Sequence, residues 1–165
     1  MTEATGSQVE VEILVDKDPA QMWDLVTDVA RIGEWSPECV SADWLDGATA
    51  RPGARFTGHN QFGDGFKGTV TCVVTEADRP VTFEWVVLDP SEVPERPGSI
   101  WRYELQPGEG PGQTRVLHRF AHGAGLTGLS ESMREDPDRA ESILRARLDQ
   151  LRKNMTVTIE GMARS

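Results

Sequence analysis

Apolar and polar residues alternate along several short stretches of the chain, which is the pattern of β-strands with one buried face. The first stretch is QVEVEILV at residues 8–15. Six more follow, separated by turns or loops rich in glycine and proline, at residues 38–46, 53–62, 66–77, 81–89, 99–107 and 114–122. Because most of these connections have hairpin length, we expect an antiparallel meander.

Helical periodicity occurs in two places. After the first strand, Asp18 can cap a helix that begins at Pro19, and apolar residues recur at helical spacing up to Ile32. The Ser-Pro pair at 36–37 predicts that this helical region bends or ends near residues 31–34.

The second helical region lies at the C-terminal end of the chain. Asp136 and Pro137 predict a helix start, and leucine, isoleucine and methionine then recur at steps of three and four from Leu144 to Met162, which predicts an amphipathic helix of roughly 25 residues. The glycine-rich segment before it, residues 123–135, predicts one helical turn plus a linker.

Length and charge limit the possible classes of protein. A chain of 165 residues is expected to form one domain, here residues 8–163, after a polar and flexible tail at residues 1–7. The tail resembles neither a signal peptide nor a transit peptide, and no apolar run reaches the ~18 residues of a membrane helix, so we expect a cytoplasmic protein without membrane insertion. The net charge of -10 disfavours nucleic acids as partners.

This order of elements, together with several residue blocks, resembles the START-like (SRPBCC) superfamily. The more specific resemblance is to its polyketide cyclase/dehydrase and lipid-transport family, and it extends from about Val9 to Met162. The blocks that carry it are DPAQMWDLVTD (18–28), WSPECVSADWLDG (35–47), PGARFTGHN (52–60), FEWVV (83–87), WRYEL (101–105) and TRV (114–116).

The resemblance implies an α+β helix-grip fold. In that fold a seven-stranded, curved antiparallel sheet wraps around the long C-terminal helix, and two short helices follow the first strand. The resemblance also implies a cavity between sheet and helix for a hydrophobic or amphipathic small molecule, such as a lipid, a sterol or a polyketide-like compound. We expect no cofactor, and no oligomeric state is predicted.

The two-residue period of strands indicates which side chains face the interior. On each strand the aromatic face is the better candidate, although any one of these aromatic residues could instead fill a core. The predicted ligand contacts from the strands are Phe56, Asn60, Phe62, Phe83, Trp85, Trp101, Tyr103, His118 and Phe120. The remaining predicted contacts are Trp35, at the corner between helix and strand, and Leu144, Leu148 and Leu151 of the terminal helix.

His118 and Tyr103 are the candidates for catalysis. An ordinary histidine titrates near pH 6.5 and can transfer protons, and a tyrosine can orient a carbonyl group, yet a lone histidine in a sheet is more often structural. A metal site is not expected, because His118 and His122 lie roughly 13 Å apart along one strand. Cys39 and Cys72 complete no standard zinc-binding spacing.

Three functions stay open. The first is a carrier or sensor that binds a hydrophobic or amphipathic ligand in the cavity. The second is a polyketide cyclase or dehydratase acting in the same cavity, which predicts convergent polar groups near Tyr103. The third is a protein-interaction module, which predicts a filled cavity and a large exposed apolar patch.

Overall fold

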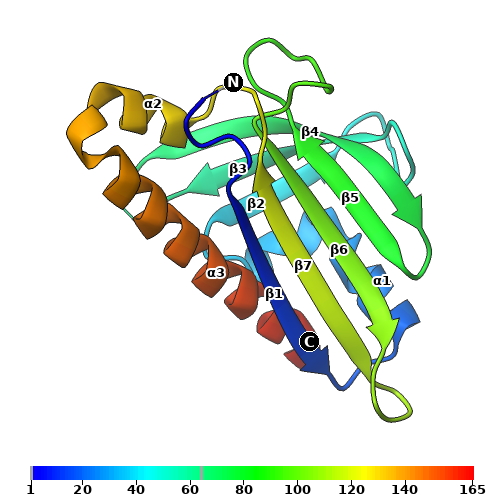
Figure 1. Cartoon of the computed structure of the whole chain (residues 1–165). Coiled ribbons are helices and arrows are strands. Elements are labelled where there is room, and N and C mark those ends of the chain that lie inside the picture. The colour runs from blue at the N-terminus through cyan, green and yellow to red at the C-terminus, as the bar shows by residue number, and fades with distance from the viewer. Residues whose placement is uncertain (1, 64) are drawn as a thin grey trace.

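The predicted strands pair into one curved antiparallel sheet (Figure 1). The computed structural model describes residues 2–63 and 65–165. The elements in chain order are β1 (Gln8–Val15), α1 (Pro19–Val26), the 3-10 helix η1 (Val29–Glu34), β2 (Cys39–Trp44), β3 (Arg55–Gln61), β4 (Lys67–Asp78), β5 (Thr82–Val87), β6 (Ser99–Pro107), β7 (Thr114–His122), α2 (Gly128–Glu135), the 3-10 helix η2 (Pro137–Arg139) and α3 (Ala140–Arg164). The predicted α+β helix-grip architecture is confirmed.

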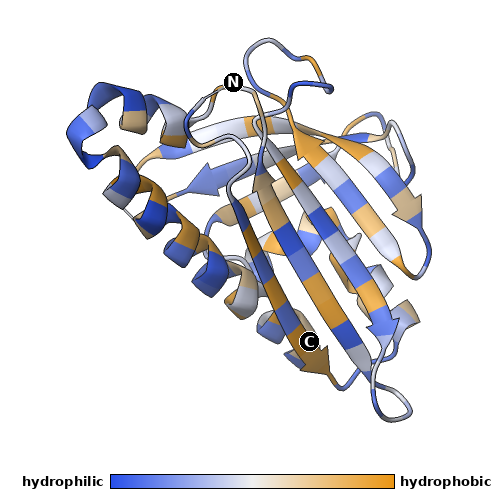
Figure 2. Ribbon diagram, in the orientation of Figure 1, coloured by the Kyte–Doolittle hydropathy of each residue, from blue (hydrophilic) through white to orange (hydrophobic). Residues whose placement is uncertain are grey.

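The sheet has seven strands in the order β1-β7-β6-β5-β4-β3-β2. Strands β2 to β7 form the expected meander, and β1 pairs with β7, so that the first and last strands of the chain are neighbours. The helix α3 runs along one side of this sheet in Figure 1, and apolar and polar residues alternate along the strands in Figure 2. One face of the sheet therefore packs on the helix, and the other faces outward.

Two short helices follow β1, as predicted. Asp18 caps α1 by accepting a hydrogen bond from the backbone N–H of Gln21, and the Gln21 side chain accepts one from the backbone N–H of Asp18. The helix then breaks, and η1 packs directly on β2. A Cβ atom at Gly33 would lie 2.1 Å from the carbonyl oxygen of Val40, so this close approach requires glycine.

The apolar stripe of α3 packs in the main core. Leu151, Met155, Ile159 and Met162 are all at most 3% exposed. Leu144 lies at the other end of the helix, in a separate small cluster. A helix of 25 residues is about 37 Å long, whereas a nine-residue strand such as β7 spans about 30 Å. The end of α3 that carries Leu144 packs against α2.

Residues 2–7, predicted as part of a flexible tail, form turns that pack on the body of the protein, while Met1 lies outside the described residues. Ala4 is fully buried beside Met133 and Ala140. The backbone N–H of Gly6 donates to the carbonyl oxygen of His122, which extends the pairing of β1 and β7. The segment predicted as one helical turn plus a linker contains the two-turn helix α2.

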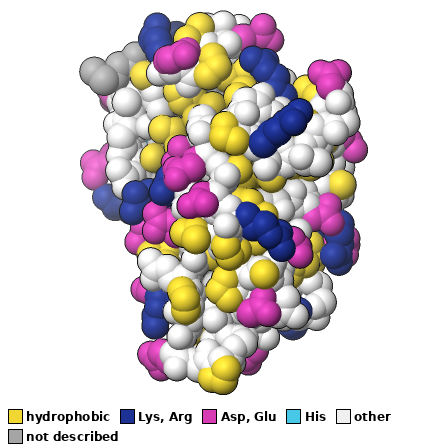
Figure 3. Space-filling view, turned by 90° about the vertical axis from the view of Figure 1, so that its right-hand side faces the viewer, with side chains coloured by type: hydrophobic (Ala, Val, Ile, Leu, Met, Phe, Trp, Pro, Cys, Tyr) yellow, Lys and Arg dark blue, Asp and Glu magenta, His cyan; other side chains and the backbone are white. Residues whose placement is uncertain are grey.

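The outward face of the sheet carries ion pairs. Arg102 donates hydrogen bonds to Glu76, Glu84 and Glu104, which come from three adjacent strands. On the side of the molecule in Figure 3, acidic and basic side chains lie interspersed with apolar ones. Within the described chain, no helix combines the length and the hydrophobicity needed to cross a bilayer.

Candidate functional site

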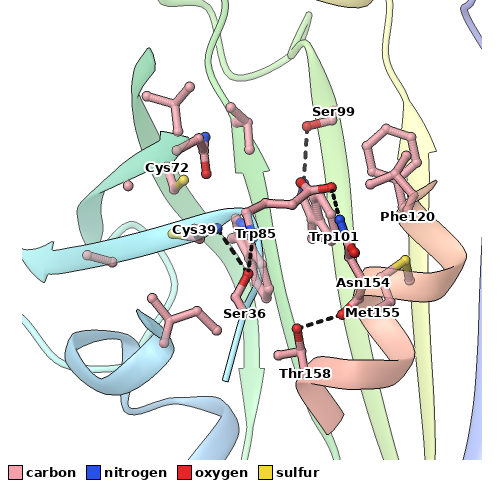
Figure 4. A pocket seen from close by; sticks show the side chains of 18 of the residues that line it. Ser36, Cys39, Cys72, Trp85, Ser99, Trp101, Phe120, Asn154, Met155 and Thr158 are labelled. Atoms are coloured by element: carbon pink, nitrogen blue, oxygen red, sulfur yellow. Dashed lines mark hydrogen bonds between the residues drawn. The ribbon is translucent and has the colours of Figure 1, made fainter. Parts of the chain in front are cut away.

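A cavity of about 710 Å³ lies between the sheet, η1 and α3. Aromatic and aliphatic side chains from β3 to β7 form one wall, and Leu151, Met155 and Thr158 of α3 form the opposite wall. Figure 4 shows Trp85 and Trp101 on adjacent strands, with residues of α3 beside them. The helix thus fills the curve of the sheet only in part.

Trp85 occupies the centre of the aromatic wall. Its ring lies 6.1 Å from that of Trp101, its directly paired neighbour on β6, and the two rings are parallel to within 3°. The rings of Phe56 and Phe83 lie 6.0 and 5.3 Å from it. Aromatic pairs at such distances stabilise the wall beyond the effect of burial alone.

His118 and Tyr103 are stacked next to this wall. They pair across β6 and β7, and their ring centroids lie 3.6 Å apart with an interplanar angle of 3°. The Nδ1 atom of His118 lies 3.0 Å from the carbonyl oxygen of Arg102, which can only accept, so Nδ1 is the donor. Burial lowers the pKa of His118 to about 4, despite this hydrogen bond, so the ring is neutral at pH 7.

Two polar atoms of this pair remain available. No hydrogen bond between described residues engages the hydroxyl of Tyr103 or the Nε2 atom of His118. Every fully inaccessible side-chain nitrogen or oxygen in the described chain has a partner, so these two atoms keep some accessible surface. Since both residues line the cavity, that surface is open to a ligand. Burial also raises the pKa of Tyr103, which keeps its hydroxyl protonated.

A second polar group lies at a more exposed part of the cavity. Arg147 donates to both carboxylate oxygens of Glu38, and Asn154 donates to the same carboxylate at 2.9 Å. The Arg147 guanidinium also lies 5.2 Å from the ring centroid of Phe62, a cation–π distance. These contacts join α3 to the segment that leads into β2.

Most of the predicted ligand contacts lie on the cavity wall, namely Phe56, Asn60, Phe62, Phe83, Trp85, Trp101, Tyr103, His118, Phe120 and Leu151. Three lie elsewhere. Trp35 packs against Gly161 of α3, Leu144 belongs to the small cluster beside α2, and Leu148 packs on the edge of the main core. Trp44, whose orientation the strand pattern does not determine, packs edge-on against Phe56.

Sequence reasoning missed the polar residues that α3 contributes. Arg147 falls outside the predicted apolar stripe of the helix, and the sequence predicts Glu38 only as the start of a strand. A signal was present, since Arg147, Leu151, Asn154 and Thr158 follow one another at steps of four, three and four. This spacing puts all four on one face of a helix.

The thiols and histidines give no sign of metal chemistry. Among the described residues, no group of three or more His, Cys, Asp or Glu side chains is arranged to hold a metal ion. Cys39 and Cys72 both line the cavity, and burial raises the pKa of each thiol. His122 is also buried, and its Nε2 atom lies 3.0 Å from the hydroxyl oxygen of Thr127.

Solved structures of bacterial proteins share this fold. The solution structure of the Polyketide_cyc-like protein Cgl2372 from Corynebacterium glutamicum is 23% identical, with a TM-score of 0.66 over 95% of this chain and 89% of its own. The protein TTHA0849 from Thermus thermophilus is 16% identical, with a TM-score of 0.67 over 96% of this chain and 95% of its own. At these identities the likeness concerns the fold alone.

The sequence itself matches a family. The model of the family described as polyketide cyclase / dehydrase and lipid transport covers residues 7–156, which is most of the chain. No curated protein matches the sequence of this chain. The family match, together with the helix-grip fold and its cavity, shows that this chain belongs to the polyketide cyclase/dehydrase and lipid-transport family of the SRPBCC superfamily.

Proposed function

We propose that this protein binds a hydrophobic or amphipathic small molecule in the cavity and acts as a carrier or a sensor. The observation that carries the proposal is the cavity itself. Its volume of about 710 Å³ falls within the ~300–1,000 Å³ that is typical of small-molecule sites. An interaction module would instead be expected to have a filled interior.

The chemistry of the wall supports the same proposal. Most of the lining side chains are aromatic or aliphatic, which favours an apolar ligand body. The polar groups of the lining include two pairs, Tyr103 with His118 and Glu38 with Arg147. An amphipathic molecule could use these groups for orientation while its apolar part contacts Trp85 and Trp101.

A cyclase or dehydratase is the second candidate, and the contact between His118 and Tyr103 is the observation that favours it. Catalysis of this kind needs a group that exchanges protons near neutral pH. His118 is poorly suited to donate a proton there, because its pKa is about 4 and its Nδ1 hydrogen bonds to the backbone. The carrier or sensor is therefore the better supported function.

A pair of substitutions on β4 tests the proposal. Val70 lines the cavity, whereas its neighbour Thr69 is exposed on the opposite face of the strand. Val70→Trp should obstruct the cavity, and Thr69→Trp should leave it open. Titration with the neutral fluorescent probe N-phenyl-1-naphthylamine should give similar dissociation constants for the wild type and Thr69→Trp. Val70→Trp should bind at least roughly tenfold more weakly, the equivalent of about 1.4 kcal/mol.

Circular dichroism and thermal unfolding would verify that both variants fold. The proposal is contradicted if the wild type does not bind the probe, or if folded Val70→Trp binds it as tightly as Thr69→Trp does.

A further inference from the structure

We propose that the cavity selects an uncharged ligand whose hydroxyl group donates a hydrogen bond to Nε2 of His118. This inference rests on the proposed function and deepens it by naming a chemical group of the ligand. It starts from an atom that has no partner in the described protein and yet belongs to a buried side chain, which is 3% exposed.

The hydrogen bond of the other ring nitrogen determines the chemistry of Nε2. Nδ1 lies 3.0 Å from the carbonyl oxygen of Arg102, and a carbonyl oxygen cannot donate. Nδ1 therefore carries the proton of the neutral ring, and Nε2 carries the lone pair. A ligand must present a donor to Nε2, because an acceptor there would face a second acceptor.

Packing holds the imidazole in this orientation. The ring of Tyr103 stacks on one face at 3.6 Å, and the rings of Trp101 and Trp85 lie 5.6 and 6.2 Å away. A flip of the ring would break the hydrogen bond between Nδ1 and the carbonyl oxygen of Arg102. The surrounding burial also disfavours the doubly protonated imidazolium, in which Nε2 would become a donor.

A neutral hydroxyl fits this site better than a carbonyl, ether, carboxylate or ammonium group. Carbonyl, ether and carboxylate oxygens offer no hydrogen to donate. An ammonium group can donate, but its transfer to the aromatic wall would bury a charge without a counter-ion beside His118. A hydroxyl can also accept, and the unbonded hydroxyl of Tyr103 lies within a few ångströms of His118 because the two rings are stacked.

Two pyrenes of matched shape test the inference. In 1-hydroxypyrene the hydroxyl takes the place of the methyl group of 1-methylpyrene, and energy transfer from Trp85 and Trp101 to a bound pyrene reports binding of either. The measured quantity is the ratio of the two dissociation constants, because this ratio removes differences that are common to both ligands. It would be measured for the wild type, for His118→Phe and for the control His59→Phe.

His59 is a matched control because it lies on β3, outside the cavity lining, and hydrogen bonds to Thr69. In His118→Phe the preference for 1-hydroxypyrene over 1-methylpyrene should fall roughly tenfold, which is the usual effect of one buried hydrogen bond. In His59→Phe the preference should equal that of the wild type. An unchanged preference in His118→Phe, with both pyrenes still bound, overturns the inference and leaves the proposed function intact.

Failure of the wild type to bind either pyrene counts against both proposals. A second measurement on the wild type does not depend on the folding of a variant. The ¹⁵N resonance of His118 Nε2 should shift on addition of 1-hydroxypyrene, as expected for a nitrogen that accepts a hydrogen bond, and should shift much less with 1-methylpyrene. Equal shifts with the two compounds overturn the inference.

Discussion

The guanidinium of Arg147 in α3 binds both carboxylate oxygens of Glu38, with N–O distances of 2.5 and 3.0 Å, and so joins the helix to the segment before β2. The two side chains are 21% and 12% exposed. Removal of one charge from a largely buried pair leaves the other without compensation, which costs more than the loss of an exposed pair. The contact is therefore expected to stabilise the packing of α3 against the segment before β2 at the cavity wall.

Substitution of Glu38 tests this contact. Glu38→Gln keeps the shape of the side chain and removes its charge, so we expect a loss of about 1–3 kcal/mol in the free energy of unfolding, measured by urea denaturation. The exposed pair between Glu141 and Arg145 provides the control, and Glu141→Gln should cost less than about 0.5 kcal/mol. Equal effects of the two substitutions would contradict this role for Glu38.

The buried imidazole of His118 predicts a loss of stability in acid. Its pKa is about 4 in the folded protein, against 6.5 for an ordinary histidine, so the unfolded chain binds a proton first as the pH falls. The stability present above pH 6.5 is thus lost progressively towards pH 4, and the contribution of His118 to this loss is on the order of 3 kcal/mol. Burial lowers the pKa of His122 as well, which acts in the same direction.

His118→Phe separates the effect of His118 from that of the other titrating groups. The free energy of unfolding of this variant should depend less steeply on pH between 6.5 and 4, whatever its stability at pH 7. Parallel curves for the wild type and the variant would show that His118 is not neutral and buried as described.

Gly33 predicts a strong effect of a single added methyl group. A Cβ atom there would lie 2.1 Å from the backbone oxygen of Val40, so Gly33→Ala must separate η1 from β2. We expect a loss of about 2–3 kcal/mol in the free energy of unfolding. At Gly128, the first residue of α2, no atom lies within 4 Å of the corresponding position, and Gly128→Ala should be neutral or stabilising by up to about 1 kcal/mol.

The two thiols are expected to react slowly in the folded protein. Burial raises the pKa of both, and Cys72 is only 3% exposed, so little thiolate is present at pH 8. In single Cys→Ser variants, labelling by a maleimide should be slower for Cys72 than for the half-buried Cys39. Unfolding in urea should abolish the difference. Rapid labelling of Cys72 in the native protein would contradict this expectation.

The fold and the aromatic wall could be predicted because their signals are local. Alternation along single strands was sufficient to assign Phe83, Trp85, Trp101 and Tyr103 to one face, and the cavity lining contains all four. The cap at Asp18 and the glycine-rich turns likewise depend on neighbouring residues. Such patterns do not require knowledge of how distant elements meet.

The polar part of the cavity could not be predicted, because it depends on contacts between distant segments. Glu38 and Arg147 are 109 residues apart, and their contact requires the position of α3 relative to the segment before β2. Leu144 shows the same difficulty. It shares the apolar stripe of α3, but its end of the helix packs against α2, so it lies in the small cluster there.

The central claim, that the cavity holds a small molecule, is tested most directly by native mass spectrometry of the protein purified from its own host. The intact mass under non-denaturing conditions should exceed the denatured mass by that of a hydrophobic or amphipathic compound. The excess should persist in Thr69→Trp and disappear in Val70→Trp. Equal native and denatured masses of the wild type, even after incubation with a lipid extract of the host, would contradict the claim.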